Sequence, residues 1–128
     1  MSTALAETLL GWYAANKRDL PWRQTSDPYV IWIAEIMLQQ TRVDSVIPYF
    51  QRWMEKFPNI ASVATSTQQE VLKLWEGLGY YARARNIYKT AQLICEQHDC
   101  IFPADYHTIK NLPGVGKASA ADIASIAF

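Results

Sequence analysis

The chain has 128 residues, of which half are hydrophobic, and its twelve basic and twelve acidic side chains give a formal net charge of zero. This length fits one domain, and the composition excludes intrinsic disorder, which combines low hydrophobicity with high net charge. The longest apolar run is too short to cross a bilayer, and Glu35 interrupts it. The neutral charge lacks the basic excess typical of nucleic-acid-binding domains, although basic residues can still gather on one face.

Helical periodicity dominates the chain, and no segment alternates with a period of two. Asp27 followed by Pro28 is typical of a helix start. Thr67 and Glu70 have the spacing of a capping box, and Asp105 can cap a further short helix. We expect an all-α protein with helices over residues 3–16, 28–40, 42–57, 60–64, 68–75, 81–97, 106–109 and 117–128.

The two cysteines, Cys95 and Cys100, are too few for a disulfide framework or a four-cysteine metal cluster. We therefore expect a reduced, cytoplasmic protein in which Cys95 packs in the core. His98 and His107 have no metal-binding or catalytic partner at a useful spacing, and we expect both on the surface. The N-terminal residues show no basic stretch ahead of apolar ones, which argues against a signal peptide.

The helix expected over residues 28–40 is apolar on nearly all sides, which predicts a central, buried position. Glu35 is the only charged residue between Asp27 and Arg42. Desolvation raises the pKa of a carboxyl group in such surroundings, which suits a general acid. The alternative is a structural glutamate that is hydrogen-bonded to a cap or paired with an arginine, and the pattern alone leaves both open.

Residues 112–117 (LPGVGK) join the last two expected helices. Gly114 and Gly116 allow a tight turn and a close approach of a ligand to the backbone. Amide groups at the start of the following helix, beside Lys117, can bind a DNA phosphate without reading sequence. An ordinary turn between two helices is the alternative.

Residues 77–86 (GLGYYARARN) place tyrosines and arginines at the start of a long helix. Arg83 and Arg85 do not share a helix face, so one can meet phosphate while the other pairs inside the protein. Tyr80 at the loop edge can enter a base stack. Packed tyrosines and solvated arginines are the alternative.

Taken together, these segments resemble the adenine DNA glycosylases of the MutY type, within the helix–hairpin–helix DNA glycosylase superfamily. The resemblance covers nearly the whole chain. It rests on residues 20–23 (LPWR), 27–29 (DPY), 33–41 (IAEIMLQQT), 46–50 (VIPYF), 75–86 (WEGLGYYARARN) and 112–117 (LPGVGK).

The resemblance implies a helical DNA glycosylase domain over residues 1–128, with the helix–hairpin–helix at about residues 105–128. It implies removal of adenine mispaired with 8-oxoguanine or guanine in double-stranded DNA, as part of base excision repair. Glu35 matches the acid that protonates the adenine, with the logic of glycoside hydrolysis. The other implied site residues are the adenine pocket (Arg18, Trp22, Arg23, Leu38), the wedge in the duplex (Gln40, Thr41, Tyr80) and the phosphate contact (Gly114, Gly116, Lys117).

Against the family's pattern, Ala118 stands where related lyases carry a lysine nucleophile, which indicates a monofunctional glycosylase. Residues 119–122 read Ser-Ala-Ala-Asp where the pattern has Thr-Ala-Gly-Ala. The family's second catalytic aspartate lies beyond Phe128, and we do not expect Asp122, within the second hairpin helix, to replace it. A non-catalytic DNA-binding fragment is therefore the alternative function.

The same comparison predicts an N-terminal part of a longer enzyme, cut within the second helix of the hairpin motif. We expect no metal and no cofactor in this chain, since the family's 4Fe–4S cluster uses cysteines found later in full-length members. We also expect no membrane contact, no obligate protein partner and a bacterial, nucleoid-associated location in the cytoplasm.

Overall fold

The computed structural model describes residues 25–39 and 41–127, and all regular structure within these residues is helical. The predicted all-α class is therefore confirmed. The helix expected over residues 3–16 lies outside the described residues, as do Arg18, Trp22, Arg23 and Gln40. The helices are α2 (Pro28–Leu38), α3 (Val43–Lys56), α4 (Ile60–Ala64), α5 (Gln68–Trp75), α6 (Ala82–His98), α7 (Tyr106–Lys110) and α8 (Lys117–Ala127).

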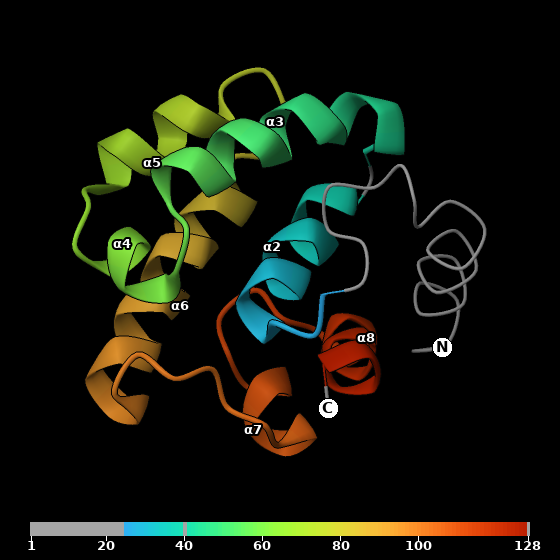
Figure 1. Cartoon of the computed structure of the whole chain (residues 1–128), viewed down its shortest axis with the longest axis vertical. Coiled ribbons are helices and arrows are strands. Elements are labelled where there is room, and N and C mark those ends of the chain that lie inside the picture. Colours follow the sequence, from blue (N-terminus) through green and yellow to red (C-terminus); the bar gives the residue numbers. More distant parts are fainter. Residues whose placement is uncertain (1–24, 40, 128) are drawn as a thin grey trace.

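Helix α2 lies near the centre of the arrangement, with α3 and α8 packed against it (Figure 1). Its start follows the sequence signals: Pro28 is the first residue, and the side chain of Asp27 accepts a hydrogen bond from Tyr29 N at 3.0 Å. Every residue from 31 to 37 is buried, including Glu35. The predicted central position of this helix is confirmed.

Helix α2 ends at Leu38, two residues earlier than the periodicity suggests. The guanidinium of Arg83 in α6 donates to Ile36 O at 2.8 Å, to Met37 O at 3.4 Å and to Gln39 O. A cation at a helix C-terminus satisfies carbonyl groups that have no partner within the helix. This long-range partner, which periodicity does not reveal, fixes the end of α2.

Aromatic side chains tie α2 to α3 and α5. Trp53 Nε1 donates to the Tyr29 hydroxyl at 2.9 Å, and that hydroxyl donates to Phe57 O at 2.6 Å. Trp53 also packs edge-on against Trp75, with ring centroids 6.0 Å apart. Burial raises the pKa of Tyr29 above its ordinary value, which keeps the phenol protonated as a donor.

The shorter helices begin where the caps predict. Thr67 and Glu70 form the expected capping box, and Asn59 and Ser62 form a second one at the start of α4. Pro48 lies within α3, which continues through it. None of the helices in residues 25–39 and 41–127 is long and apolar enough to cross a membrane.

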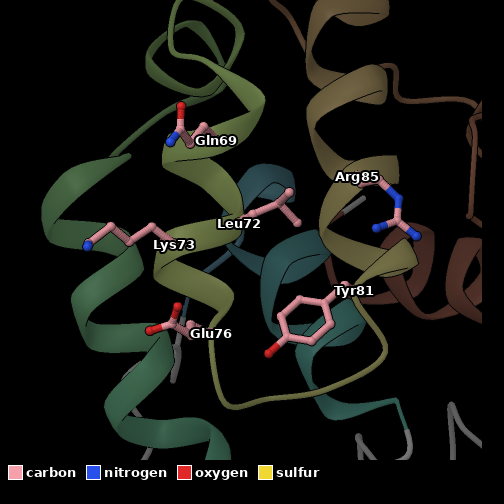
Figure 2. Close-up of a pocket in the computed structure, with 6 residues that line it drawn as sticks. All are labelled: Gln69, Leu72, Lys73, Glu76, Tyr81 and Arg85. Atoms are coloured by element: carbon pink, nitrogen blue, oxygen red, sulfur yellow. The ribbon is translucent and has the colours of Figure 1, made fainter.

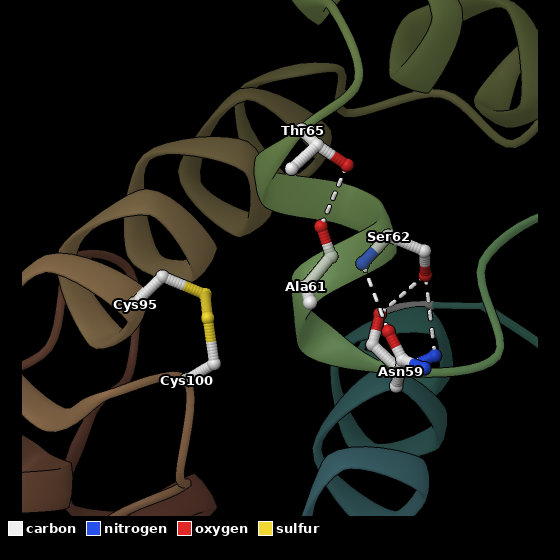
Figure 3. The surroundings of a disulfide bond; sticks show 6 residues. All are labelled: Asn59, Ala61, Ser62, Thr65, Cys95 and Cys100. Atoms are coloured by element: carbon white, nitrogen blue, oxygen red, sulfur yellow. Dashed lines mark hydrogen bonds between the residues drawn. A yellow bond between two sulfur atoms is a disulfide. The ribbon is translucent and has the colours of Figure 1, made fainter.

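The end of α6 corrects one expectation. Cys95 and Cys100 are joined by a disulfide, rather than being reduced with Cys95 in the core, and Cys95 is only half-buried (Figure 3). After His98 the chain turns sharply, because Asp99 and Cys100 both have positive φ, at 53° and 62°. This turn brings Cys100 back beside the last turn of α6, a contact that residue counting does not reveal.

The last two helices form the expected hairpin. The side chain of Asp105 caps α7 by accepting from Thr108 N at 3.0 Å, and α7 packs against α8. The turn between them includes Gly114, with φ of 75°. Because α8 also packs against α2, the hairpin lies beside the helix that carries Glu35 (Figure 1).

Candidate active site

Glu35 in α2 and Asp122 in α8 form a buried carboxyl pair. Both side chains have no exposed surface, and none of their four oxygens accepts a hydrogen bond from a donor group of the described residues. Burial raises the pKa of Glu35 well above its ordinary range, and the neighbouring Asp122 adds to this by hydrogen bonding and charge. The predicted apolar setting of Glu35 is therefore present, with a second acid that raises the pKa further.

The pairing of Glu35 with an arginine or a helix cap is absent from the part of the chain that the structure describes. The groups that act on the Glu35 carboxyl are burial and Asp122. Arg83 directs its guanidinium to the carbonyl groups at the end of α2 instead. Burial without a compensating cation raises the pKa of a carboxyl group, which favours the protonated state that a general acid needs.

Sequence reasoning considers Asp122 only as a replacement for the family's second aspartate and does not place it beside Glu35. Its signal was a single charge among the small and apolar residues that surround it in the last helix. Burial raises its pKa, and the hydrogen bond with Glu35 lowers it. Glu35 and Asp122 are 87 positions apart in the sequence, and their contact depends on how α8 packs against α2.

Two contacts align α2 with α8. Gln39 Nε2 donates to Ser119 Oγ at 2.8 Å. Gln39 lies one helical turn beyond Glu35, and Ser119 lies one turn before Asp122, so the four residues form two adjacent contacts between helices running in opposite directions. The second of these contacts is the carboxyl pair.

Two of the predicted wedge residues, Thr41 and Tyr80, contact Arg83. Its Nη2 donates to Thr41 Oγ1 and to Gly79 O, each at 3.3 Å. Its guanidinium also lies over the ring of Tyr80, 5.3 Å from the centroid. The Tyr80 side chain is 61% exposed, and its backbone φ is 53°. Arg83 is thus the arginine that pairs inside the protein, while Arg85 is exposed.

The hairpin glycines have different surroundings. A Cβ added to Gly114 would lie 2.7 Å from Asn86 Nδ2, in addition to the strain of a positive φ. A Cβ added to Gly116 would meet nothing within 4 Å. Gly114, Gly116 and Lys117 are all exposed. Gly114 is needed for packing, whereas Gly116 leaves space beside the helix start.

A separate hollow of about 490 Å³ lies between α5 and the start of α6 (Figure 2). Its lining combines a carboxylate, two cationic side chains and Tyr81, and it includes neither member of the carboxyl pair. In the predicted adenine pocket, Leu38 is half-buried one turn after Glu35, and the other three residues lie outside the described part. The hollow is therefore distinct from the buried acid.

The described residues offer no site for an iron–sulfur cluster or another metal. No group of three or more His, Cys, Asp or Glu side chains in residues 25–39 and 41–127 is placed to hold an ion. The two cysteines are joined to each other.

The fold and the hairpin beside a buried acid define a known class of protein. The family model for HhH-GPD superfamily base excision DNA repair proteins matches residues 33–122, which is more than half of the chain. The chain therefore belongs to the HhH-GPD superfamily of base excision DNA repair proteins. The match includes both Glu35 and Asp122.

Within this superfamily, the similar proteins are named adenine DNA glycosylase, which confirms the resemblance found in the sequence. The protein from Buchnera aphidicola subsp. Baizongia pistaciae is 48% identical over 123 residues, which is 95% of this chain and 35% of that protein. The Homo sapiens protein is 42% identical over 135 residues, 98% of this chain and 25% of its own length. The chain thus spans about a third or less of the curated relatives that it matches.

Solved structures agree on the fold. A thermostable thymine-DNA glycosylase superimposes with a TM-score of 0.81 and 29% identity, covering 99% of this chain and 59% of its own. A non-covalent endonuclease III–DNA complex gives a TM-score of 0.74 over 96% of this chain and 60% of that one. At 22% identity, this second likeness shows the fold alone. The predicted helix–hairpin–helix glycosylase fold is confirmed.

Proposed function

We propose that the chain is part of an adenine DNA glycosylase that hydrolyses the N-glycosidic bond of adenine mispaired with 8-oxoguanine or guanine. The observation that carries this proposal is the buried Glu35, whose pKa is raised by burial and by Asp122, in a chain that is 48% identical to a protein of that name. The partner is double-stranded DNA, which would place the protein with the chromosome. Any iron–sulfur cluster would depend on residues outside this sequence, because the described residues supply no ligand set.

In the proposed reaction, the adenine leaves the base stack and enters a pocket beside α2. Glu35 donates its proton to adenine N7, which makes the base a better leaving group, and the glycosidic bond to C1′ breaks. A water molecule then adds its oxygen to C1′ and releases a proton, which restores the acid. Ala118 provides no amine, so no Schiff base forms at that position.

The remaining residues act on DNA. Leu38, with Arg18, Trp22 and Arg23, would line the adenine pocket. Thr41 and Gln40 would fill the gap in the duplex on one side, and the exposed Tyr80 would enter the stack on the other. Gly114, Gly116 and Lys117 would hold a backbone phosphate at the start of α8. Arg83 supports the wedge, because it contacts both Thr41 and Gly79.

The test is single-turnover release of adenine from a duplex with one A opposite 8-oxoguanine, using this chain, Glu35→Gln and Glu96→Gln. Glu96 is an exposed glutamate in α6 and serves as the matched control. We expect Glu35→Gln to slow release by at least about a hundredfold, in line with the loss of a general acid, and Glu96→Gln to have no effect. Equal rates for Glu35→Gln and the parent would disprove the assignment of the acid.

Binding of the same duplex is measured alongside. If the chain binds the mismatch and releases no adenine, the chain is a recognition module without chemistry, which is the alternative that the sequence left open. If the chain neither binds nor cleaves, the proposal fails for this chain.

A further inference from the structure

The contact between Glu35 and Asp122 indicates a role for Asp122 that the proposed reaction does not include. The catalytic part of this inference rests on the proposed function. We propose that Asp122 is a positioning residue for Glu35: the Asp122 carboxylate accepts a hydrogen bond from the protonated Glu35, and the pair shares one proton at neutral pH.

Hydrogen-bond counting supports this arrangement. The carboxyl oxygens of Glu35 and Asp122 are buried, and none of them has a donor partner among the described residues. Buried polar groups are nearly always hydrogen-bonded, because an unpaired one is costly. Two carboxylates cannot bond to each other, since both are acceptors only, but one proton between them turns one group into a donor. The shared proton satisfies both groups at once.

The packing of α2 against α8 holds the two groups in this geometry. The Gln39–Ser119 hydrogen bond, one turn away on both helices, aligns the two helices. The side chains of Glu35 and Asp122 then face each other where α2 packs against α8. Neither group has another titratable or charged neighbour among those that influence it in the described residues.

The directions of titration agree with a proton that stays on Glu35. Burial and Asp122 both raise the pKa of Glu35. Burial also raises the pKa of Asp122, but the hydrogen bond with Glu35 offsets part of that rise. Two like charges in a dry site are unfavourable, so the pair loses its last proton only at alkaline pH. Asp122 therefore keeps Glu35 protonated, and this is the proton that the proposed reaction would transfer to the adenine.

A cation held between two carboxylates is the competing explanation. Ca²⁺ and Mg²⁺ take six or more oxygen ligands in most sites. Here the two carboxyl groups stand alone, and the described residues include no cluster of three metal-ligating side chains. A shared proton neutralises the site with the groups that are present.

The proton can be observed directly by carbon-13 NMR of the side-chain carboxyl groups during a pH titration of the 128-residue chain. We expect the Glu35 carboxyl signal of the parent to stay in its protonated position beyond pH 7. In Asp122→Asn, whose amide replaces the carboxylate with little change of shape, Glu35 is expected to titrate at least one pH unit lower. Ser125→Ala, at an exposed position of the same helix, is the matched control and is expected to leave the titration of Glu35 unchanged.

Three results would overturn the proposal. The first is titration of both carboxyl groups near their ordinary values in the parent chain. The second is an unchanged Glu35 titration in Asp122→Asn. The third is a shift of both carboxyl signals on addition of Mg²⁺ or Ca²⁺, which would identify a cation site. None of these readouts requires activity, so they remain decisive if the proposed function fails.

Where the parent chain releases adenine, the pH profile provides a second readout. Loss of Asp122 is expected to move the alkaline limb of the single-turnover rate to lower pH by the same amount as the NMR titration. A merely structural role would lower the rate by the same factor at every pH, and that outcome would also contradict the proposal.

Discussion

At the scale of single residues, Glu35 links the stability of the protein to pH. Its pKa is raised on folding, so the folded chain holds a proton that the unfolded chain releases above about pH 4.3. The stabilisation is therefore complete at acid pH and is lost as the pH rises toward the raised value. We expect the free energy of unfolding, measured with urea, to fall between pH 5 and 8 by up to about 1.4 kcal/mol per pH unit.

Glu35→Gln is expected to reduce this slope, because its amide does not titrate and only the raised pKa of Asp122 remains, whereas Glu96→Gln is expected to retain it. The exposed Glu70 and Asp105 have lowered pKa values, so they act in the opposite direction and only at more acid pH. An equally steep slope in Glu35→Gln would show that another group carries the proton.

Gly114 and Gly116 offer a comparison between two neighbouring glycines in one turn. Gly114→Ala combines a positive φ with a collision against Asn86, and we expect it to lower the free energy of unfolding by about 1–3 kcal/mol. Gly116→Ala meets open space and is expected to change stability by less than about 0.5 kcal/mol. If the backbone at Gly116 approaches a phosphate, Gly116→Ala weakens DNA binding in a fully folded protein. Unchanged binding would remove Gly116 from the phosphate site.

At the scale of the elements, Arg83 determines where α2 ends. It also holds the segments after α2 and before α6, which carry the predicted wedge residues Thr41 and Tyr80. Arg83 donates to carbonyl groups on both sides of the end of α2 and to Gly79 O before α6. A lysine carries the charge but lacks the planar fork that reaches several acceptors. We expect Arg83→Lys to lower the free energy of unfolding by about 1–3 kcal/mol and to speed amide exchange near residues 36–41.

Arg85→Lys is the matched control, because Arg85 is exposed two positions away on the same helix. It is expected to leave both stability and amide exchange unchanged. Equal effects of the two substitutions would mean that the hydrogen bonds of Arg83 do not hold the end of α2.

At the scale of the whole molecule, local signals predicted the elements and long-range contacts decided the site. The caps at Asp27, Thr67 and Asp105 lie next to the helices that they start, so the sequence alone placed those starts. The contact of Asp122 with Glu35 depends on the packing of two distant helices, and no periodic pattern contains that information.

The distinction between local signals and long-range contacts also explains where the structure differs from the other sequence-based predictions. The end of α2 is fixed by Arg83, 44 positions beyond the Gln39 carbonyl that it reaches. The Cys95–Cys100 disulfide depends on two successive residues with positive φ, a backbone path that the composition did not suggest. The roles of the remaining DNA-contacting residues stay predictions, because they concern a ligand rather than the fold.

The neutral net charge makes the salt dependence of DNA binding informative about the whole surface. Affinity for duplex DNA falls with salt in proportion to the number of phosphates that basic residues neutralise. In a chain with no excess of basic residues, we expect a slope that corresponds to a few local contacts, with Lys117 among them. Lys117→Gln is expected to reduce the slope by about one.

Lys56→Gln, at a residue already paired with Glu70 at 3.5 Å, is the control and is expected to leave the slope unchanged. A slope unaffected by Lys117→Gln would place the phosphate contacts away from the start of α8, and the hairpin would then be a structural turn.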